Sequence, residues 1–528
     1  MQPDMKRADS KLGRRMAKGS IIMVLLNGLS RSVGLVSGII LARLLTPDDF
    51  GLVSLAMMIT GTIQVVGQFG ADLALIHDQA AARPEYDTAW TMQVLKGFTR
   101  GTALMLVAPF AAHYFDDERL TQVLLALAAI YVFSGFQNIG TVDFRKHLQY
   151  GPLIRIRIFT KLGAFVASIG VAVIWRTYWA LIVGIIAERM VNTAMSYAMH
   201  PYRPQFSLQS WRKIMRFSNW IAINNILTYF NGRADVFILG RAIDTHGVGL
   251  YSVAKRFSNV AASEITMPAA ETLFPGFAKL SADVERLGSL YVSSLALLLF
   301  VGLPVSVGVY LFGDLIVQVV LGEQWLPAVP LLKILAIYGI VRTSVGSTSS
   351  VMLALGKPHL LTALNAARFL IMVPLALWWV TIWGATGVAW AVVASAAASM
   401  LLNTFAVSHT IRFSVARISA GIWRVVISAA VMSVIVYLFR EVWPTAHGLW
   451  MSLAQLLALA ALGATAYLAS CAALWALAGF PDGPEKHVLT VVRQTLARFT
   501  GMLRGQSPPL PPPGPVQALP GFADNDVT

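Results

Sequence analysis

Apolar stretches of about 20 residues recur along almost the whole chain, separated by short polar connections. A helix of about 20 apolar residues crosses the roughly 30 Å hydrocarbon core of a bilayer, so each stretch is long enough for one membrane span. We identify about fourteen such stretches, at residues 21–42, 52–75, 89–113, 120–140, 153–174, 178–199, 218–240, 247–274, 288–313, 329–355, 360–382, 386–409, 420–439 and 450–479. The pattern predicts an all-α, polytopic membrane protein.

The chain repeats itself around a polar corner between two of these stretches. The segment ILARLLTPDDFGLVSLA at residues 40–56 returns as ILGRAIDTHGVGLYSVA at residues 238–254, with Arg43 aligned to Arg241 and Gly51 to Gly249. This offset predicts two pseudo-symmetric lobes of six helices each, at residues 21–217 and 218–411. Because six is even, both lobes insert in the same orientation, an arrangement found in transporters that bind substrate between two halves.

Three further regions complete the predicted organisation. Residues 1–20 form a basic cytoplasmic tail, residues 412–480 two additional C-terminal helices, and residues 481–528 a proline-rich cytoplasmic tail that we expect to be disordered. At the end of the N-lobe, residues 201–217 lead into the next span. There Trp211, Ile214 and Phe217 alternate with basic residues, which predicts a short amphipathic helix on the inner membrane surface.

The composition is typical of a membrane protein, and the positions of the basic residues explain its net positive charge. Hydrophobic residues make up 56% of the chain and charged residues 13%, whereas about a quarter of the residues of a globular protein are charged. The net charge of +15 comes from Lys and Arg concentrated in the tails and in alternate loops. This asymmetry predicts that both termini are cytoplasmic. The charge therefore reflects membrane topology, and we expect no nucleic-acid partner.

Polar side chains inside the spans are the candidate functional residues, because a charge at mid-bilayer is costly unless it faces a cavity or a partner. In the seventh span four polar residues lie within about 40° of the helix circumference, so this face is expected to line a wet space. A looser stripe follows the second span. The predicted polar lining consists of Asn27, Gln64, Gln68, Asn224, Thr228, Asn231 and Asn365.

Four basic residues inside the spans are candidate anion-binding groups: Arg31, Lys255, Arg256 and Arg368. Arginine suits phosphate in particular, because its planar guanidinium donates two hydrogen bonds at once. Three acidic residues, Asp72, Asp235 and Glu264, are candidates for ion coupling, with a structural hydrogen bond between helices as the alternative. We expect Lys161 to extend to the inner membrane surface, and Glu188 to pair with its neighbour Arg189.

The sequence contains no recognisable catalytic motif. The GK dipeptide in LALGKPHLL lacks the upstream glycine and the following Ser or Thr of a phosphate-binding loop. No nucleophile elbow, zinc motif or paired loop carboxylates occur. The single cysteine, Cys471, excludes a disulfide framework. We therefore predict that the protein is not an enzyme and needs neither metal nor cofactor.

Several segments together resemble the polysaccharide transporter branch of the multidrug/oligosaccharidyl-lipid/polysaccharide flippase superfamily, the Wzx-type flippases. They include LARLLTPDDFGLVSLAM, RADVFILGRAIDTHGVGLYSVAKRFSNV and LGEQWLPAVPLLKILAIYG, and the similarity extends over residues 17–480. The resemblance implies a bacterial inner-membrane protein with two six-helix lobes and two extra helices around a cationic cavity. It also implies that alternating access carries undecaprenyl-diphosphate-linked oligosaccharide across the membrane, for exopolysaccharide, capsule or O-antigen synthesis.

The same resemblance makes Arg31, Lys255, Arg256 and Arg368 expected substrate contacts. It implies membrane lipids as partners, together with contact to the polysaccharide polymerase or export machinery. Two alternatives stay open. A membrane-bound glycan polymerase or ligase usually has a sizeable outward loop, whereas the outer loops here are short. A drug or cation antiporter of the same superfamily favours acidic cavity residues, whereas basic candidates outnumber acidic ones here.

Overall fold

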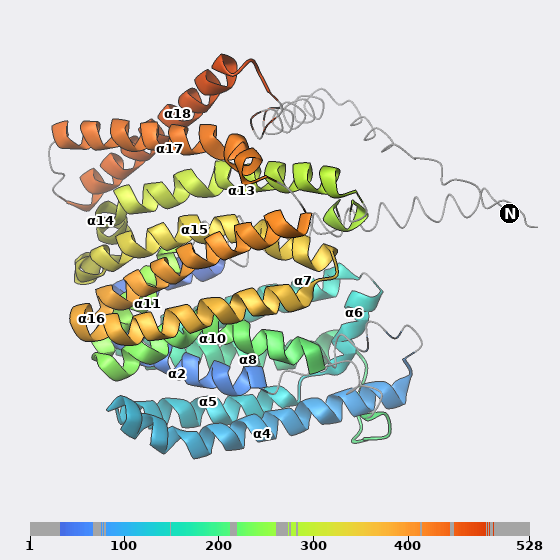
Figure 1. Cartoon of the computed structure of the whole chain (residues 1–528). Helices are drawn as coiled ribbons and strands as arrows, with labels where there is room; N and C mark the ends of the chain where they lie inside the picture. Colours follow the sequence, from blue (N-terminus) through green and yellow to red (C-terminus); the bar gives the residue numbers. More distant parts are fainter. Residues whose placement is uncertain are drawn as a thin grey trace, which may run out of the picture.

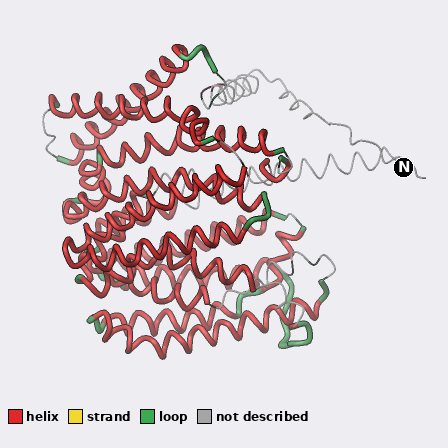
Figure 2. Tube along the Cα trace, viewed as in Figure 1, coloured by secondary structure: helices red, strands yellow, loops and turns green. Residues whose placement is uncertain are grey.

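In the computed structural model, long helices lie side by side in one bundle (Figure 1). The structure describes residues 32–66, 75, 78, 81–147, 149–211, 219–259, 273, 276–280, 283–411, 414–443, 448–481, 483, 485 and 489. Within these residues helices are joined by turns and short loops, and no strand occurs (Figure 2). The predicted all-α fold is confirmed.

The helices follow the apolar stretches of the sequence. The first half contains the helix Ser32–Leu44, α2 (Pro47–Val66), α4 (Arg83–Phe115), α5 (Arg119–Gly135), η1 (Ile139–Thr141), α6 (Val142–Lys146), α7 (Tyr150–Trp175) and α8 (Trp179–Met199). The second half contains α10 (Asn219–Ala242), α11 (Thr245–Ser258), α13 (Val284–Leu311), α14 (Gly313–Ile316), η3 (Val317–Leu321), η4 (Glu323–Ala328), α15 (Val329–Ala354) and α16 (Pro358–Ile411). At the C-terminal end, α17 (Val415–Val442) and α18 (Leu449–Leu477) form an antiparallel pair.

The helix α16 covers two of the predicted spans. Its backbone leaves the helical conformation at Gly384, where φ is 57° and ψ is −132°. Glycine adopts positive φ at little steric cost, so the chain reverses there. By length and composition six described helices are apolar enough to cross a membrane, and a bent pair of helices would make a seventh. The total of fourteen spans stays a prediction.

The two copies of the repeat contact each other where α2 and α11 cross. A Cβ atom on Gly51 would lie 1.9 Å from the carbonyl oxygen of Thr245, and a Cβ atom on Gly249 would lie 1.8 Å from that of Pro47. The aligned glycines therefore make the same contact in both directions, and neither position has room for a side chain. Two lobes related by a pseudo-two-fold axis would produce this reciprocity. The division of the chain into lobes at residues 21–217 and 218–411 therefore stays our hypothesis.

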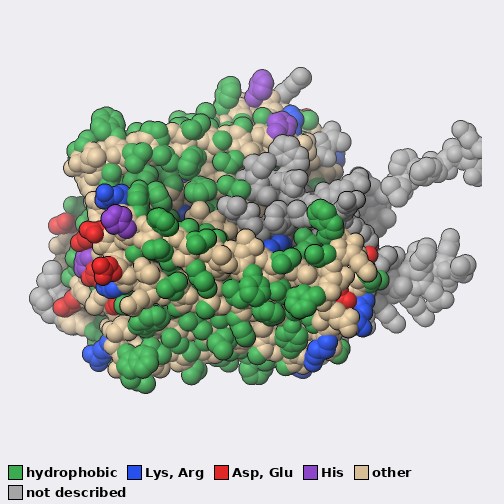
Figure 3. Space-filling view, turned by 90° about the horizontal axis from the view of Figure 1, so that it is seen from below, with side chains coloured by type: hydrophobic (Ala, Val, Ile, Leu, Met, Phe, Trp, Pro, Cys, Tyr) green, Lys and Arg blue, Asp and Glu red, His purple; other side chains and the backbone are tan. Residues whose placement is uncertain are grey.

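Two large apolar cores hold the bundle together. One lies where the halves meet and includes the fully buried Leu52, Tyr251 and Trp325. The other joins α13 to α17 and α18, where the Tyr467 hydroxyl donates a 2.9 Å hydrogen bond to the Phe300 carbonyl. On the face seen in Figure 3, hydrophobic side chains form a broad band between charged side chains near the two ends. Such a band is expected of a surface that faces lipid.

The connection after α8 begins in a non-helical conformation, ahead of the predicted amphipathic helix. Residues 201–208 are not helical, because Pro201 and Pro204 disfavour a helix and their neighbours find hydrogen-bond acceptors on α4. The Asp87 carboxylate accepts hydrogen bonds from the Tyr202 hydroxyl at 2.5 Å and from the Gln205 amide at 2.9 Å. The segment is thus tied to α4, and residues 212–217 of the predicted helix lie outside the described residues.

The beginning of the C-terminal tail is also held by the bundle. Arg424 of α17 donates to Glu485 at 2.9 Å, and both side chains are buried. The expected disorder from residue 481 onward is therefore wrong for Glu485, because a buried arginine needs a counter-ion. Residues 490–528 lie outside the described residues.

Candidate functional site

The structure describes the side chains of eight of the candidate residues. These are Gln64, Thr228, Asn231, Asp235, Lys255, Arg256, Asn365 and Arg368. Asn27, Arg31, Gln68, Asp72 and Glu264 lie outside the described residues, and Asn224 lies in α10 with its side chain outside the described part.

Two candidates from different predicted roles form one ion pair. Asp235 of α10 is 1% exposed, and its Oδ2 atom lies 2.5 Å from Nζ of Lys255 on α11. The Tyr251 hydroxyl also donates to Asp235 at 2.5 Å, and Lys255 donates to the Gly232 carbonyl at 2.8 Å. In this conformation the Lys255 ammonium is therefore bound to a partner within its own lobe.

We expect Lys255→Met to lower the free energy of unfolding by about 3–5 kcal/mol, because Asp235 then stays buried without a counter-ion. The double variant Asp235→Asn/Lys255→Met is expected to recover most of this loss, since it removes both charges. Thermal unfolding of the purified protein in detergent measures both effects. A double variant as unstable as the single one would show that packing, and not charge, explains the loss.

A second polar group links α10, α15 and α16. The Arg368 guanidinium donates to the Tyr338 hydroxyl at 3.1 Å and lies 5.3 Å from the centre of that ring. The Asn231 amide donates to the Asn365 carbonyl at 2.8 Å. Within the described residues, Arg368 Nε and Asn231 Oδ1 are buried without a hydrogen-bond partner. Buried polar atoms are usually satisfied, so these two have capacity for water or a ligand. Thr228, one turn before Asn231 on α10, is exposed.

The first half contains a related polar group around the predicted Gln64, whose partners the sequence did not indicate. The Gln64 carbonyl accepts a hydrogen bond from Arg100 of α4 at 3.1 Å, and its side chain accepts one from Tyr131 of α5 at 3.4 Å. The Arg189 guanidinium lies 5.9 Å from the centre of the Tyr131 ring. Glu188 therefore does not pair with Arg189 as expected, because Arg189 faces α5. The periodicity of one span does not reveal which neighbouring span it contacts.

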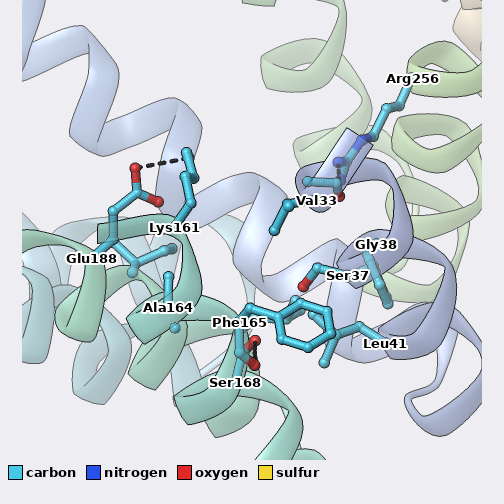
Figure 4. Close-up of a pocket in the computed structure, with 15 residues that line it drawn as sticks. Val33, Ser37, Gly38, Leu41, Lys161, Ala164, Phe165, Ser168, Glu188 and Arg256 are labelled. Atoms are coloured by element: carbon cyan, nitrogen blue, oxygen red, sulfur yellow. Dashed lines mark hydrogen bonds and ion pairs between the residues drawn. The ribbon is translucent and has the colours of Figure 1, made fainter. Parts of the chain in front are cut away.

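A cavity of about 230 Å³ lies between the helix Ser32–Leu44, α7 and α8, with Arg256 of α11 on the opposite side (Figure 4). Small residues make room for it, among them Gly34, Gly38 and Gly184. The i, i+4 spacing of Gly34 and Gly38 is the sequence signal that would have pointed to this face.

Charged groups face this cavity from two sides, and most of the remaining lining residues are apolar or small. Lys161 Nζ lies 2.9 Å from Glu188 Oε1, and both side chains are partly exposed to the cavity. Lys161 thus does not extend to the membrane surface as expected, because the α7–α8 hairpin brings Glu188 to the same level. Arg256 donates to the Gly34 carbonyl at 3.3 Å (Figure 4). Two basic groups and one acidic group therefore share this pocket.

The two halves contact each other at the polar turns of the two repeated segments. We call this the corner contact and define it by Arg43, Asp48, Trp325, Arg241 and His246. Arg43 donates to the Val319 and Val320 carbonyls of the second half. The Trp325 indole donates to the Ala42 carbonyl at 2.7 Å.

The aligned residues of the repeat make matching contacts there. Arg241, the counterpart of Arg43, lies 5.7 Å from the centre of the Tyr114 ring in the first half. Asp48 Oδ2 lies 3.3 Å from Nδ1 of its own counterpart, His246. The corner contact therefore joins the two halves at one end of the bundle.

Asp117 adds a titratable connection beside the corner contact. It accepts a 3.1 Å hydrogen bond from Thr245 of the second half and pairs with Arg119 at 2.7 Å. Burial would raise the pKa of Asp117, but the hydrogen bonds and charge of Arg119, together with the Thr245 hydroxyl, lower it below its usual value.

The pKa of Asp117 is lower in the folded protein than in the unfolded chain, so the ionised carboxylate stabilises the folded state. This contribution is complete above the ordinary Asp pKa of about 3.9 and is lost as the pH falls through the lowered value. We therefore expect Asp117→Asn to lower the melting temperature between pH 5 and pH 7, with a smaller difference from the unmodified protein at the lowest pH that both tolerate. Melting curves over this pH range measure the effect, with the exposed Glu118→Gln as control. A difference that does not depend on pH would contradict the role of the carboxylate charge.

A bundle of long helices with an apolar outer surface, two contacting halves and a polar pocket inside is the construction of a multi-pass membrane transporter. A family model described as polysaccharide biosynthesis protein matches residues 40–330. The chain therefore belongs to this family, in the polysaccharide transporter branch of the multidrug/oligosaccharidyl-lipid/polysaccharide flippase superfamily, and the resemblance in the sequence is confirmed.

Individual relatives agree with this assignment. The chain is 23% identical over 359 residues to the lipopolysaccharide biosynthesis protein WzxC of Escherichia coli (strain K12). The aligned region covers 67% of this chain and 72% of that protein. It is 25% identical over 310 residues to the succinoglycan biosynthesis transport protein ExoT of Rhizobium meliloti (strain 1021), with 56% and 61% covered. The lipid II flippase MurJ in an inward closed conformation has the same fold, with a TM-score of 0.68, 14% identity, and 86% of this chain and 99% of that chain covered.

Proposed function

We propose that the protein is a flippase that moves undecaprenyl-diphosphate-linked oligosaccharide repeat units from the inner to the outer leaflet of the bacterial inner membrane. The observation that carries this proposal is the pocket in Figure 4, where basic side chains from both halves face a cavity inside an apolar bundle. The relationship to polysaccharide biosynthesis and transport proteins supports the glycan-lipid substrate. In this function the protein is a transporter and not an enzyme.

The proposed mechanism is alternating access. The diphosphate and the glycan enter between the halves from the cytoplasm, while the polyprenyl chain stays in the lipid. Arg256 and Arg368 offset the cost of removing water from the diphosphate, and Asn231 and Gln64 hydrogen-bond to sugar hydroxyls. Breaking the corner contact then opens the pocket to the outside. Arg31 and Lys255 are further proposed substrate contacts, with Lys255 leaving Asp235 on substrate binding.

Other parts of the proposal come from the sequence alone. We propose that both termini are cytoplasmic, that the glycan belongs to an exopolysaccharide, capsule or O-antigen, and that a polymerase or export complex receives it. Asp72, Asp235 and Glu264 stay candidates for ion coupling.

A deletion strain tests the function against its two rivals. Lipid-linked repeat units should accumulate in the inner leaflet, and leaflet-resolved analysis of the lipid-linked sugars measures this. Units that accumulate unpolymerised in the outer leaflet would instead indicate a polymerase or ligase. Drug sensitivity with normal polymer would indicate an efflux antiporter. Complementation with the intact gene is the control.

A further inference from the structure

The Lys161–Glu188 pair lies near the middle of the helices α7 and α8. Lys161 is eleven residues from the start of α7 at Tyr150, and Glu188 is eleven residues from the end of α8 at Met199. At 1.5 Å per residue both lie about 16.5 Å from those helix ends, a depth near the centre of a roughly 30 Å hydrocarbon core for a helix that spans it. An ion pair at this depth is costly unless it serves packing or binding.

This pair is accessible and is not part of a solid core. The side chains of Lys161 and Glu188 are 35% and 40% exposed, and both line the cavity that Arg256 faces from the other side (Figure 4). By contrast, the structural pair Arg424–Glu485 is 8% and 6% exposed. A ligand can therefore reach Lys161 and Glu188 without unpacking the helices.

We propose that Glu188 is an internal counter-ion that occupies Lys161 in the ligand-free protein and is displaced by a phosphate group of the substrate. This inference rests on the proposed function, because it takes the substrate to be a prenyl diphosphate. The phosphate binds in the cavity with Lys161 and Arg256 as its cations. No covalent bond forms or breaks, and Lys161 exchanges one anionic oxygen partner for another.

The size and the lining of the cavity fit this ligand. Pockets that enclose drug-sized ligands measure about 300–1,000 Å³, so a cavity of about 230 Å³ holds only a part of a lipid-linked oligosaccharide. Lys161 and Arg256 supply positive charge for the phosphate, while Phe165, Leu41 and Leu181 supply an apolar wall for the adjoining prenyl carbons. An uncharged lipid gains nothing by displacing Glu188, so the counter-ion selects for phosphate.

Lys161 of α7 pairs with Glu188, and Arg256 of α11 faces the same cavity from the other side. Arg189, the next residue on α8, lies instead over the Tyr131 ring of α5. In the described part of the helix Ser32–Leu44 the only charged residue is Arg43, at the corner contact. Glu188 is thus the only carboxylate among the residues that line the cavity.

The test is a binding titration of the full-length protein in detergent with farnesyl diphosphate as the probe. We expect Glu188→Gln to tighten binding about tenfold at neutral pH, because Lys161 no longer has a competing carboxylate. The difference should vanish for farnesol, which lacks phosphate. Glu285→Gln, an exposed glutamate of α13, is the matched control.

The possible results separate the two proposals. A Glu188→Gln variant that binds farnesyl diphosphate equally or more weakly overturns the counter-ion, as does an equal gain for farnesol. Should Glu188→Gln fold poorly, Lys161→Met/Glu188→Leu removes both charges together, and it must bind farnesyl diphosphate more weakly than the unmodified protein or the inference is wrong. If the unmodified protein binds neither probe, the proposed function itself fails.

Discussion

Replacing Arg256 by glutamate is expected to reduce polymer export at least about 30-fold, which corresponds to roughly 2 kcal/mol of lost interaction with the diphosphate. The guanidinium of Arg256 faces the same pocket as Lys161 from the opposite side, so a carboxylate there would add a second negative charge to the lining that already contains Glu188. Exported polysaccharide in a complemented deletion strain measures the effect. Arg368→Glu is expected to act in the same direction.

The amount of Arg256→Glu protein in the membrane should stay close to normal. The described hydrogen bond of Arg256 reaches the Gly34 carbonyl at the edge of the cavity, where water can replace it. Arg286→Glu is the control, because Arg286 is an exposed residue of α13 outside the cavity. Normal export by both Arg256→Glu and Arg368→Glu would contradict the assignment of these residues to the substrate path.

Cross-linking the corner contact is expected to stop export almost completely. Asp48 and His246 lie on different halves with their side-chain atoms 3.3 Å apart, so cysteines at both positions can be joined by a short bifunctional methanethiosulfonate. The link would hold the outer end closed and prevent the outward-facing state that alternating access requires. Export from cells or vesicles, measured before and after reduction of the cross-link, tests this.

The double variant Asp48→Cys/His246→Cys brings its own controls. Each single-cysteine variant treated with the same reagent should export normally, and reduction should restore export in the double variant. The native Cys471 is buried in α18 and does not compete for the reagent. Undiminished export after complete cross-linking would show that the corner contact does not open during transport.

Much of the fold was predictable because its signals are local. Apolar stretches of membrane-crossing length mark the helices wherever they pack, and even the break within α16 at Gly384 lies between two predicted stretches. The repeat is equally visible, since Gly51 and Gly249 align without knowledge of any contact. The hydrogen bonds that hold the connection after α8 were not predictable in this way, because they come from Asp87 and neighbouring threonines more than a hundred residues away.

The candidate site was only partly predictable. Periodicity showed that Asn231 and Asp235 share one face of α10, and the structure places both among polar partners of neighbouring helices. Periodicity did not show that Asp235 binds Lys255. The sequence had suggested different roles for these two residues. Lys161 and Glu188 were each expected elsewhere, and although Arg256 was predicted to face a cavity, its place opposite these two residues was not expected.

By itself, the sequence determined that this chain is a membrane protein of many helices, that it is built as a repeat, and which intramembrane residues are polar. These properties follow from hydrophobicity and helical period, which involve residues close together in the chain, and from the alignment of the repeated segment with its second copy. Only the tertiary structure decided which charges pair, where the cavity lies and how the two copies of the repeat meet. Those outcomes depend on which helices become neighbours, and a helical period specifies that a face is buried or wet without specifying the helix opposite to it.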